Sequence, residues 1–233
     1  VAPSRGLGDV YKRQRVLDKS EPKYMNSSET PVYSKRRVLY GLNLAKKSKR
    51  PNIILCEGNL DIVTLHQAGF DNAVASMGTA LTVEQTRLLS RFTKELVLCY
   101  DNDNAGKIAT ERALQILNGS EFSVKVLQLP RRLVDGEYIK QDADDFIKFQ
   151  GPDAFERLLN GSENGVEFRM AQIAGKYDLK DDEARIAYCG EVSELLASLP
   201  GAVEREIYTG RAAEAAGITA EAMKLEVQRL SLI

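Results

Sequence analysis

Two stretches of the chain decide its fold: NIILCEG at residues 52–58 and ELVLCYDND at residues 95–103. Each contains an apolar run of strand length and composition, and each is followed by a helical pattern. Strands that alternate with helices predict a parallel sheet, because a parallel pair needs a long crossover that a helix fills. Side chains just beyond the carboxyl ends of these strands are therefore the first candidates for chemistry.

Carboxylates occupy both strand ends. Glu57 follows the first run, and Asp101 and Asp103 follow the second. If the two strands are neighbours, three carboxylates converge, and each unpaired one raises the pKa of the others. A hard divalent cation relieves that repulsion, and Mg²⁺ commonly binds one or two carboxylates together with substrate phosphates. The pattern predicts a Mg²⁺ site that handles phosphoryl groups, and the competing interpretation is an ordinary turn rich in Asp and Asn.

The residues around these carboxylates resemble a known family. A strand that ends in Glu-Gly, followed by a strand that ends in Asp-x-Asp, is similar to the Toprim fold of topoisomerases, primases, some nucleases and recombination proteins. EGNLD at residues 57–61, AVASMGT at 73–79 and YDNDNAG at 100–106 resemble bacterial replicative DNA primase of the DnaG type. The resemblance runs from about Arg15 to near the end of the chain. It implies an α/β fold: a Toprim-like four-stranded parallel sheet flanked by helices, then a C-terminal helical subdomain.

Composition excludes several classes of protein. The chain has 233 residues, of which 43% are hydrophobic and 28% charged, so a real core is expected and wholesale disorder is not. No apolar run reaches the roughly 20 residues of a membrane span, and we expect no membrane partner. Lys plus Arg (32) balances Asp plus Glu (33), but a basic stretch precedes the acidic site. Its members are Lys35, Arg36, Arg37, Lys46, Lys47, Lys49 and Arg50.

The cysteines and the single histidine point away from a zinc site. Cys56, Cys99 and Cys189 are widely spaced, and the first two lie in expected buried strands. We interpret them as small core residues in a reducing compartment. His66 is the only histidine, so no zinc is expected within this chain, and His66 is interpreted as a packing or surface residue.

Four segments are expected along the chain. Residues 1–14 lack periodicity and do not match the primase pattern, so they are interpreted as disordered or foreign. Residues 15–50 resemble the end of the N-terminal subdomain of the primase catalytic core, with a helix over residues 35–47. Residues 51–134 form the expected Toprim domain, and residues 135–233 the expected helical subdomain.

Within the Toprim segment the pattern predicts strands near 52–56, 72–76, 95–100 and 122–129, and helices near 60–68, 82–92 and 107–117. Gly69 is expected to stop the first helix. Thr82 and Gln85 have the spacing of a capping box. Gly106 is expected to allow a close backbone approach. Residues 133–141 are interpreted as a charged connection.

A further acidic stretch, DADDFI, occupies residues 142–147. The primase family commonly has Asp-Pro-Asp here, and the resemblance adds Asp142 and Asp144 to the acidic cluster. Ala143 replaces the proline, which frees the backbone. The alternative is that Asp142 or Asp144 only caps the following helix, and the sequence leaves both interpretations open.

From Pro152 onward the pattern is helical, over residues 153–159, 166–177, 181–199, 202–216 and 219–230. Asp181 and Thr219 are expected N-caps. This part resembles the helical subdomain that closes the primase catalytic core. We assign no chemistry to it and interpret it as a packing or partner-binding module.

The resemblance implies DNA-dependent synthesis of RNA primers by metal-assisted nucleotidyl transfer, in the cytoplasm of a bacterium. Glu57, Asp101 and Asp103 would be the catalytic residues and, with Asp142 and Asp144, would hold Mg²⁺ or Mn²⁺. The implied partners are a single-stranded DNA template, ribonucleoside triphosphates and the RNA primer. A replicative helicase would bind through a C-terminal domain expected to lie outside this chain.

Supporting roles are assigned to four further residues. Asp61 lies one helical turn after Glu57 on the same face, and would hold a metal ligand in position without binding the ion itself. The resemblance makes Arg15, Lys23 and Lys35 contacts to nucleic acid or nucleotide, since Lys and Arg supply most sequence-independent affinity for phosphates. On charge alone, a solvated basic loop that binds nothing explains them better, and the neighbouring acidic site favours the functional interpretation.

Two other functions remain open at this stage. One is a different Toprim enzyme, such as a Mg²⁺-dependent nuclease or a topoisomerase, although no clear tyrosine nucleophile stands out. The other is a non-catalytic recombination module that binds DNA. The chain is expected to be a fragment of a primase, so its activity on its own is also open.

Overall fold

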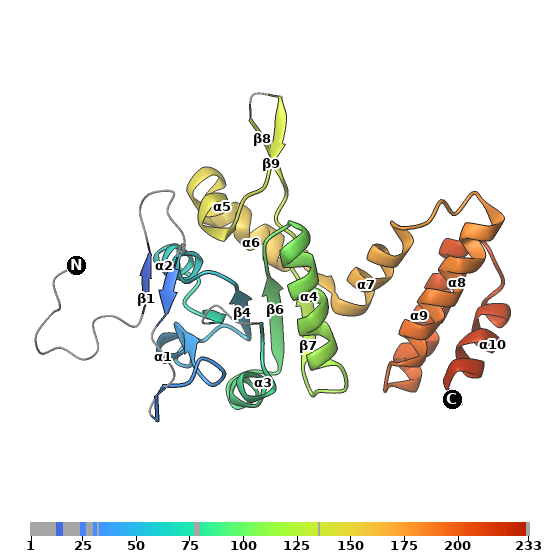
Figure 1. Cartoon of the computed structure of the whole chain (residues 1–233), viewed down its shortest axis with the longest axis horizontal. Helices are drawn as coiled ribbons and strands as arrows, with labels where there is room; N and C mark the ends of the chain where they lie inside the picture. Colours follow the sequence, from blue (N-terminus) through green and yellow to red (C-terminus); the bar gives the residue numbers. More distant parts are fainter. Residues whose placement is uncertain are drawn as a thin grey trace, which may run out of the picture.

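The computed structural model describes residues 13–15, 24–26, 30–31, 33–76, 80–134 and 136–231, with the backbone alone described for residues 13–15 and 24–26. Figure 1 shows an elongated molecule in which a central sheet with its helices lies beside a separate helical bundle at the C-terminal end. A small antiparallel pair, β1 (Arg13–Arg15) with β2 (Tyr24–Asn26), lies on the N-terminal side of the sheet.

The central sheet has the strand order β10-β7-β6-β4-β5-β3. Its four inner strands run parallel, as expected: β4 (Asn52–Cys56), β5 (Ala73–Ser76), β6 (Glu95–Cys99) and β7 (Ser123–Val126). Two strands of two residues each, β3 (Leu39–Tyr40) and β10 (Glu163–Asn164), pair antiparallel at the edges. The expected four-stranded sheet is therefore the parallel centre of a six-stranded mixed one.

Helices cover both faces of the sheet because side chains alternate along each strand. In β4, Ile54 and Cys56 face a core shared with α2 (Asn59–Gln67), α5 (Ala143–Gln150) and α6 (Pro152–Asn160). Ile53 and Leu55 face the opposite core, which contains residues of α3 (Val83–Leu89) and α4 (Asn104–Leu117). Strands buried on both faces explain the near-continuous apolar runs in the sequence.

Several local predictions are confirmed. Gly69 follows α2 with a φ of +93°, as a helix stop requires. Thr82 and Gln85 form the capping box at α3, where each side chain accepts a hydrogen bond from the other's backbone N–H at 3.1 Å. Cys56 and Cys99 are buried on neighbouring strands, whereas Cys189 is partly exposed.

The expected helix over residues 35–47 is wrong. The chain makes a turn, then β3, then the short α1 (Leu42–Ala45). Gly41 explains the break: its φ is +82°, and a Cβ there would lie 2.9 Å from the carbonyl oxygen of Ala73. The chain therefore bends closely over β5, which a continuous helix would not allow.

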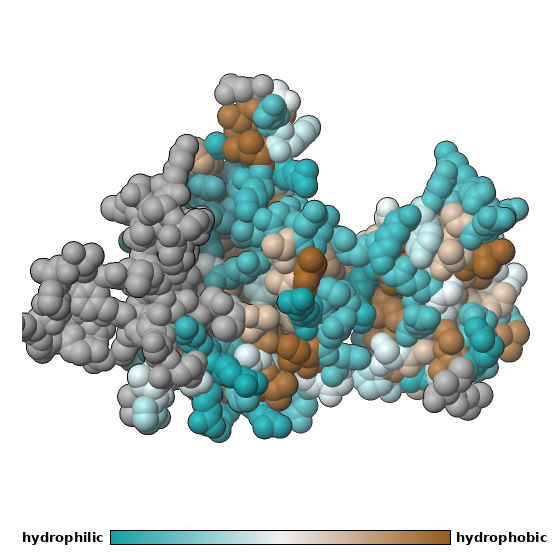
Figure 2. Space-filling view, viewed as in Figure 1, coloured by the Kyte–Doolittle hydropathy of each residue, from teal (hydrophilic) through white to brown (hydrophobic). Residues whose placement is uncertain are grey.

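Residues 132–139 form a hairpin where a charged connection was expected. β8 (Arg132–Val134) pairs antiparallel with β9 (Glu137–Ile139). The hairpin projects from the body of the molecule (Figure 1). Its side chains include exposed apolar ones, Leu133 at 57% and Tyr138 at 70%, and Figure 2 shows the apolar patch on this projection.

The C-terminal bundle has a hydrophobic core of its own. It is built from α8 (Asp182–Ala197), α9 (Ala202–Ala216) and α10 (Ala220–Ser231). Asp181 caps α8, accepting the Ala184 N–H at 2.8 Å, and the Thr219 hydroxyl accepts the Ala222 N–H at 3.3 Å. In the described part of the chain, no helix is long and apolar enough to cross a membrane.

One helix joins the two cores. α7 (Gly165–Ala174) places Phe168 in the core of the sheet and Ile173 in the core of the bundle. α5 and α6 pack on the sheet, and α7 leads from the sheet to the bundle.

Candidate metal centre

The carboxyl ends of the central strands β4 and β6 place Glu57 and Asp101 side by side. We call this end of the sheet, with Asp103, the acidic edge. β4 and β6 pair in parallel with Cys56 opposite Cys99, so the residues that follow them leave the sheet side by side. Gly106 then fixes the loop after β6, because a Cβ at this position would lie 1.9 Å from the carbonyl oxygen of Asp101. The close approach predicted for Gly106 is confirmed, and it holds the first turn of α4 against the Asp101 backbone.

Glu57 is a half-buried carboxylate with an unsatisfied oxygen. Its Oε1 is buried and has no hydrogen-bond partner. Burial raises the pKa of Glu57, the nearby charge of Asp101 raises it further, and a hydrogen bond from the Asp101 backbone opposes both. A buried oxygen of this kind needs a partner, and a cation is the partner that a carboxylate oxygen favours most.

Asp101 and Asp103 share a lysine. Lys140 Nζ lies 2.7 Å from Asp103 Oδ2 and 3.7 Å from Asp101 Oδ2. Burial raises the pKa of Asp101 despite this lysine, whereas the hydrogen bond from Lys140 lowers the pKa of Asp103. Asp103 Oδ1 also caps α4 by accepting the Gly106 N–H at 2.8 Å, so α4 begins at Asn104 and not near residue 107.

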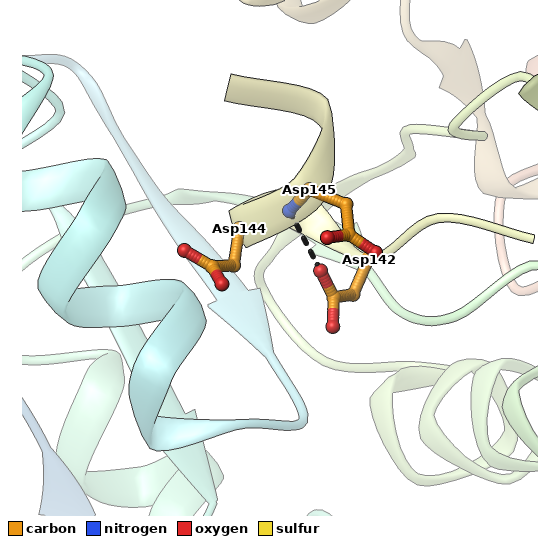
Figure 3. Close-up of side chains that lie close together, drawn as sticks. All are labelled: Asp142, Asp144 and Asp145. Carbon is orange, nitrogen blue, oxygen red and sulfur yellow. Dashed lines mark hydrogen bonds between the residues drawn. The ribbon is translucent and has the colours of Figure 1, made fainter. Parts of the chain in front are cut away.

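A second acidic group lies at the start of α5 (Figure 3). Asp142, Asp144 and Asp145 each offer a carboxylate oxygen, and these oxygens lie within 4.8 Å of one another. Among the residues that the structure describes, this trio meets that criterion, and the expected trio of Glu57, Asp101 and Asp103 does not. The strand-end carboxylates are thus neighbours that influence one another's pKa, but they are spread wider than the sequence suggested.

The side chains of this second group also have structural partners. Asp142 Oδ1 accepts the Asp145 N–H at 2.8 Å, so the helix-capping interpretation of Asp142 is correct alongside its place in the group. Asp144 accepts the hydroxyl of Thr64 on α2 and pairs with Lys148 at 2.5 Å. Sequence reasoning missed Asp145, although three carboxylates within four residues were a visible signal.

Asp61 connects the two acidic groups. It is only 6% exposed. Its Oδ2 accepts the Gly58 N–H at 3.1 Å, and its Oδ1 accepts the Asp144 N–H at 3.2 Å. Burial, with the charge of Asp142 as a second cause, raises the pKa of Asp61 to about 7. The side chain therefore holds the end of β4 against the start of α5.

The donor set fits a hard divalent cation. Every candidate ligand at this edge is a carboxylate oxygen, the type that Mg²⁺ and Mn²⁺ prefer. Among the described residues, no thiol or imidazole joins the group at α5. The unsatisfied Oε1 of Glu57 points to the same conclusion.

The expected basic contacts are only partly visible. Lys23 and the side chain of Arg15 lie outside the described residues, as do residues 77–79 of the AVASMGT stretch. Lys35 lies in the turn before β3, where its carbonyl oxygen accepts a hydrogen bond from the Gln85 side chain at 3.1 Å. This contact holds the turn against α3.

Comparisons with known proteins agree with the fold. Residues 54–147 match the Toprim-like family model, and residues 13–46 match the N-terminal domain of the DNA primase catalytic core. A solved DNA primase domain from Pseudomonas aeruginosa is 31% identical, with a TM-score of 0.76, over 95% of this chain and 67% of that one.

The chain belongs to the bacterial DNA primase family.

Two further primases agree. A DNA primase of Clostridium acetobutylicum is 39% identical over 210 residues, which are 90% of this chain and 34% of that protein. A structure of a primase catalytic domain bound to single-stranded DNA is 30% identical, with a TM-score of 0.74, over 90% of this chain and 66% of that one. The chain thus spans about a third of the length of the curated primases that it matches.

One further family model matches the helical part of the chain. Residues 166–221 match the family model described as the DnaB-helicase binding domain of primase. This segment covers α7, α8 and α9, inside the chain. Helical periodicity shows packing faces but not the partner of an exposed one, so the sequence alone does not assign this segment.

Proposed function

We propose that this chain is the part of a bacterial primase that joins ribonucleotides into an RNA primer on a single-stranded DNA template. The carrying observation is the acidic edge of the sheet, where the unsatisfied oxygen of Glu57 lies beside Asp101, in a chain whose relatives are primases. Bacterial primases act on the chromosome, so we place the reaction in the cytoplasm.

Each residue of the edge has a proposed task. Glu57, Asp101 and Asp103 would hold one Mg²⁺ or Mn²⁺, and Asp142 and Asp144, with Asp145, a second. When bound, such ions lower the pKa of the attacking 3′-hydroxyl and neutralise charge on the leaving pyrophosphate. Asp61 acts as a positioning residue, since it ties Gly58 to the start of α5.

Binding of the template and the nucleoside triphosphate is assigned to cationic side chains. Arg15, Lys23 and Lys35 are the proposed contacts, because phosphate neutralisation by Lys and Arg dominates nucleic-acid affinity. A nuclease or a non-catalytic recombination module is not favoured, because the relatives and solved neighbours described above are primases.

The test measures Mg²⁺-dependent primer synthesis by the parent chain and by a variant of a proposed metal ligand. The chain is incubated with Mg²⁺, ribonucleoside triphosphates and single-stranded DNA, and the products are sized. Lengthened RNA supports a primase, and shortened DNA supports a nuclease. Glu57→Gln removes the charge of one proposed ligand. Loss of a residue that only supports a ligand lowers metal affinity or activity by roughly 10- to 100-fold, and Glu57→Gln should lower them by more. Glu84→Gln on α3 is the control and should behave as the parent; equal activity of Glu57→Gln and the parent would refute the assignment.

We also propose that the bundle binds the replicative helicase. The match over residues 166–221 supports this, and so do large apolar side chains exposed on α8, α9 and α10. They are Ile186 at 72%, Val203 at 75%, Ile207 at 51% and Leu225 at 59%. Sedimentation of the chain with the helicase should show a complex that Ile186→Asp or Val203→Asp weakens. An unchanged complex in both variants would move the contact elsewhere.

A further inference from the structure

The β8–β9 hairpin brings one cation to the acidic edge. Lys140 follows directly after β9, the second strand of this hairpin. Its ammonium group lies between two carboxylates, 2.7 Å from Asp103 Oδ2 and 3.7 Å from Asp101 Oδ2. Its side chain is 58% exposed, so solvent reaches it. The proposed function gives this residue no task.

The position of the ammonium conflicts with a metal ion. Mg²⁺ binds carboxylate oxygens at about 2.0–2.1 Å and demands a nearly ideal octahedron. An ion held by Asp101 and Asp103 would therefore lie within a few ångströms of the present Lys140 Nζ. Two cations at that distance repel each other, so the ion and this lysine position exclude one another.

We propose that Lys140 is a built-in counter-ion of Asp101 and Asp103 which a divalent cation must displace. The inference rests on the proposed metal site. In the absence of the ion, Lys140 offsets the negative charge of the two carboxylates. When the ion binds, Lys140 moves out into solvent on its flexible stem.

Two other lysine–carboxylate pairs bear on this proposal. Lys148 lies 2.5 Å from Asp144 one turn away along the same helix, so it stands in the same relation to the second proposed ion. Lys125 pairs with Glu95 at 3.1 Å, at the start of β6, which is the opposite end of the strand that leads to Asp101. Lys125 is thus a matched control: the same residue type, paired with a carboxylate of the same strand, away from the acidic edge.

The test measures Mn²⁺ affinity of the full chain by electron paramagnetic resonance at low salt, where ion pairs are least screened. Lys140→Met keeps the unbranched stem and removes the charge. We expect it to bind Mn²⁺ about two- to fivefold more tightly, the size of one partly exposed ion pair. Lys125→Met should bind as the parent does, and Lys140→Arg, which keeps the charge, should not gain affinity.

A double variant assigns the gain to the right carboxylate. Asp101→Asn combined with Lys140→Met should lose the gain, because two residues that act on each other are not additive. A second readout is the Cε resonance of Lys140 in a Mg²⁺ titration, which should shift as the ion pair breaks. Lys140→Gln repeats the measurement should the Met variant fold poorly by circular dichroism.

Unchanged or weaker Mn²⁺ binding by Lys140→Met, with Asp101→Asn still abolishing the site, would overturn this inference alone. Absence of Mn²⁺ binding in the parent and in every variant would overturn the metal site as well. Metal binding without primer synthesis would count against the proposed function and leave the competition with Lys140 standing.

Discussion

The acidic edge of the sheet and the surface of the helical bundle treat carboxylates in opposite ways. At the edge, burial raises the pKa values of Glu57, Asp61 and Asp101. On the bundle, hydrogen bonds from Lys176 and Arg229 lower the pKa values of Glu191 and Glu226. Asp103 is the exception at the edge, because the hydrogen bond from Lys140 lowers its pKa. A carboxylate that is buried at a cost remains available for a ligand.

The largest expected effect is on stability, and a change in the core of one region should leave the other region protected. Phe155 is fully buried beneath the sheet and lies edge-to-face on Phe70, with centroids 4.8 Å apart. Phe155→Ala should lower the free energy of unfolding by about 3–5 kcal/mol. Amide hydrogen exchange should show lost protection in α2 and β4 while α8 and α9 keep theirs.

The control for this core variant is Ile186→Ala on α8. Ile186 is 72% exposed, so the change should stay within about 0.5 kcal/mol of the parent. Equal loss of protection in α8 of the Phe155 variant would mean that the two cores unfold as one unit.

Adding a single methyl group at one glycine of each region tests the comparison further. At Gly106 a Cβ would lie 1.9 Å from the Asp101 carbonyl oxygen, so Gly106→Ala should destabilise the chain by about 1–3 kcal/mol and weaken metal binding. At Gly190, within α8, a Cβ meets nothing within 4 Å. Gly190→Ala should therefore stabilise the chain by about 0.5–1 kcal/mol. Urea unfolding measures both, and effects of the same sign would contradict the assigned packing.

The smallest effect is a difference in pH dependence. Asp61 has a pKa of about 7 in the folded chain against an ordinary value of 3.8. Between these values the folded state holds a proton that the unfolded state lacks, so its stabilising contribution is lost as pH rises toward and through 7. Glu226 has the opposite sign: Arg229 lowers its pKa, so its contribution is present above 4.5 and is lost as pH falls.

Carboxyl ¹³C NMR separates the two titrations in one experiment. The Asp61 resonance should have a midpoint well above that of Glu226. A midpoint near 4 for Asp61 would show that water reaches this side chain and would remove the contrast between the regions.

The features that sequence predicted are those with a local or periodic signal. The apolar runs ending at Cys56 and Cys99 marked the parallel strands, because burial on both faces leaves little room for polar residues. The capping box at Thr82 and the close approach at Gly106 follow from chemistry within a few residues. The Asp103 cap is equally local, and it was overlooked because Asp103 had been assigned to the metal alone.

The features that sequence missed depend on distant contacts. β3 and β10 have two residues each, too few to show any periodicity. The hairpin formed by β8 and β9 was not predicted, because its charged residues favoured a connecting segment. The pairing of Lys140 with Asp103 spans 37 positions and depends on how that hairpin leaves the sheet.

The burial of the cysteines has a practical consequence for studying this chain. Cys56 and Cys99 are 0% and 3% exposed directly behind the acidic edge, whereas Cys189 on α8 is partly accessible. A maleimide dye should thus attach to α8 alone, without mutagenesis and far from the catalytic chemistry. Its fluorescence anisotropy would then report the docking of a helicase on the labelled chain in real time.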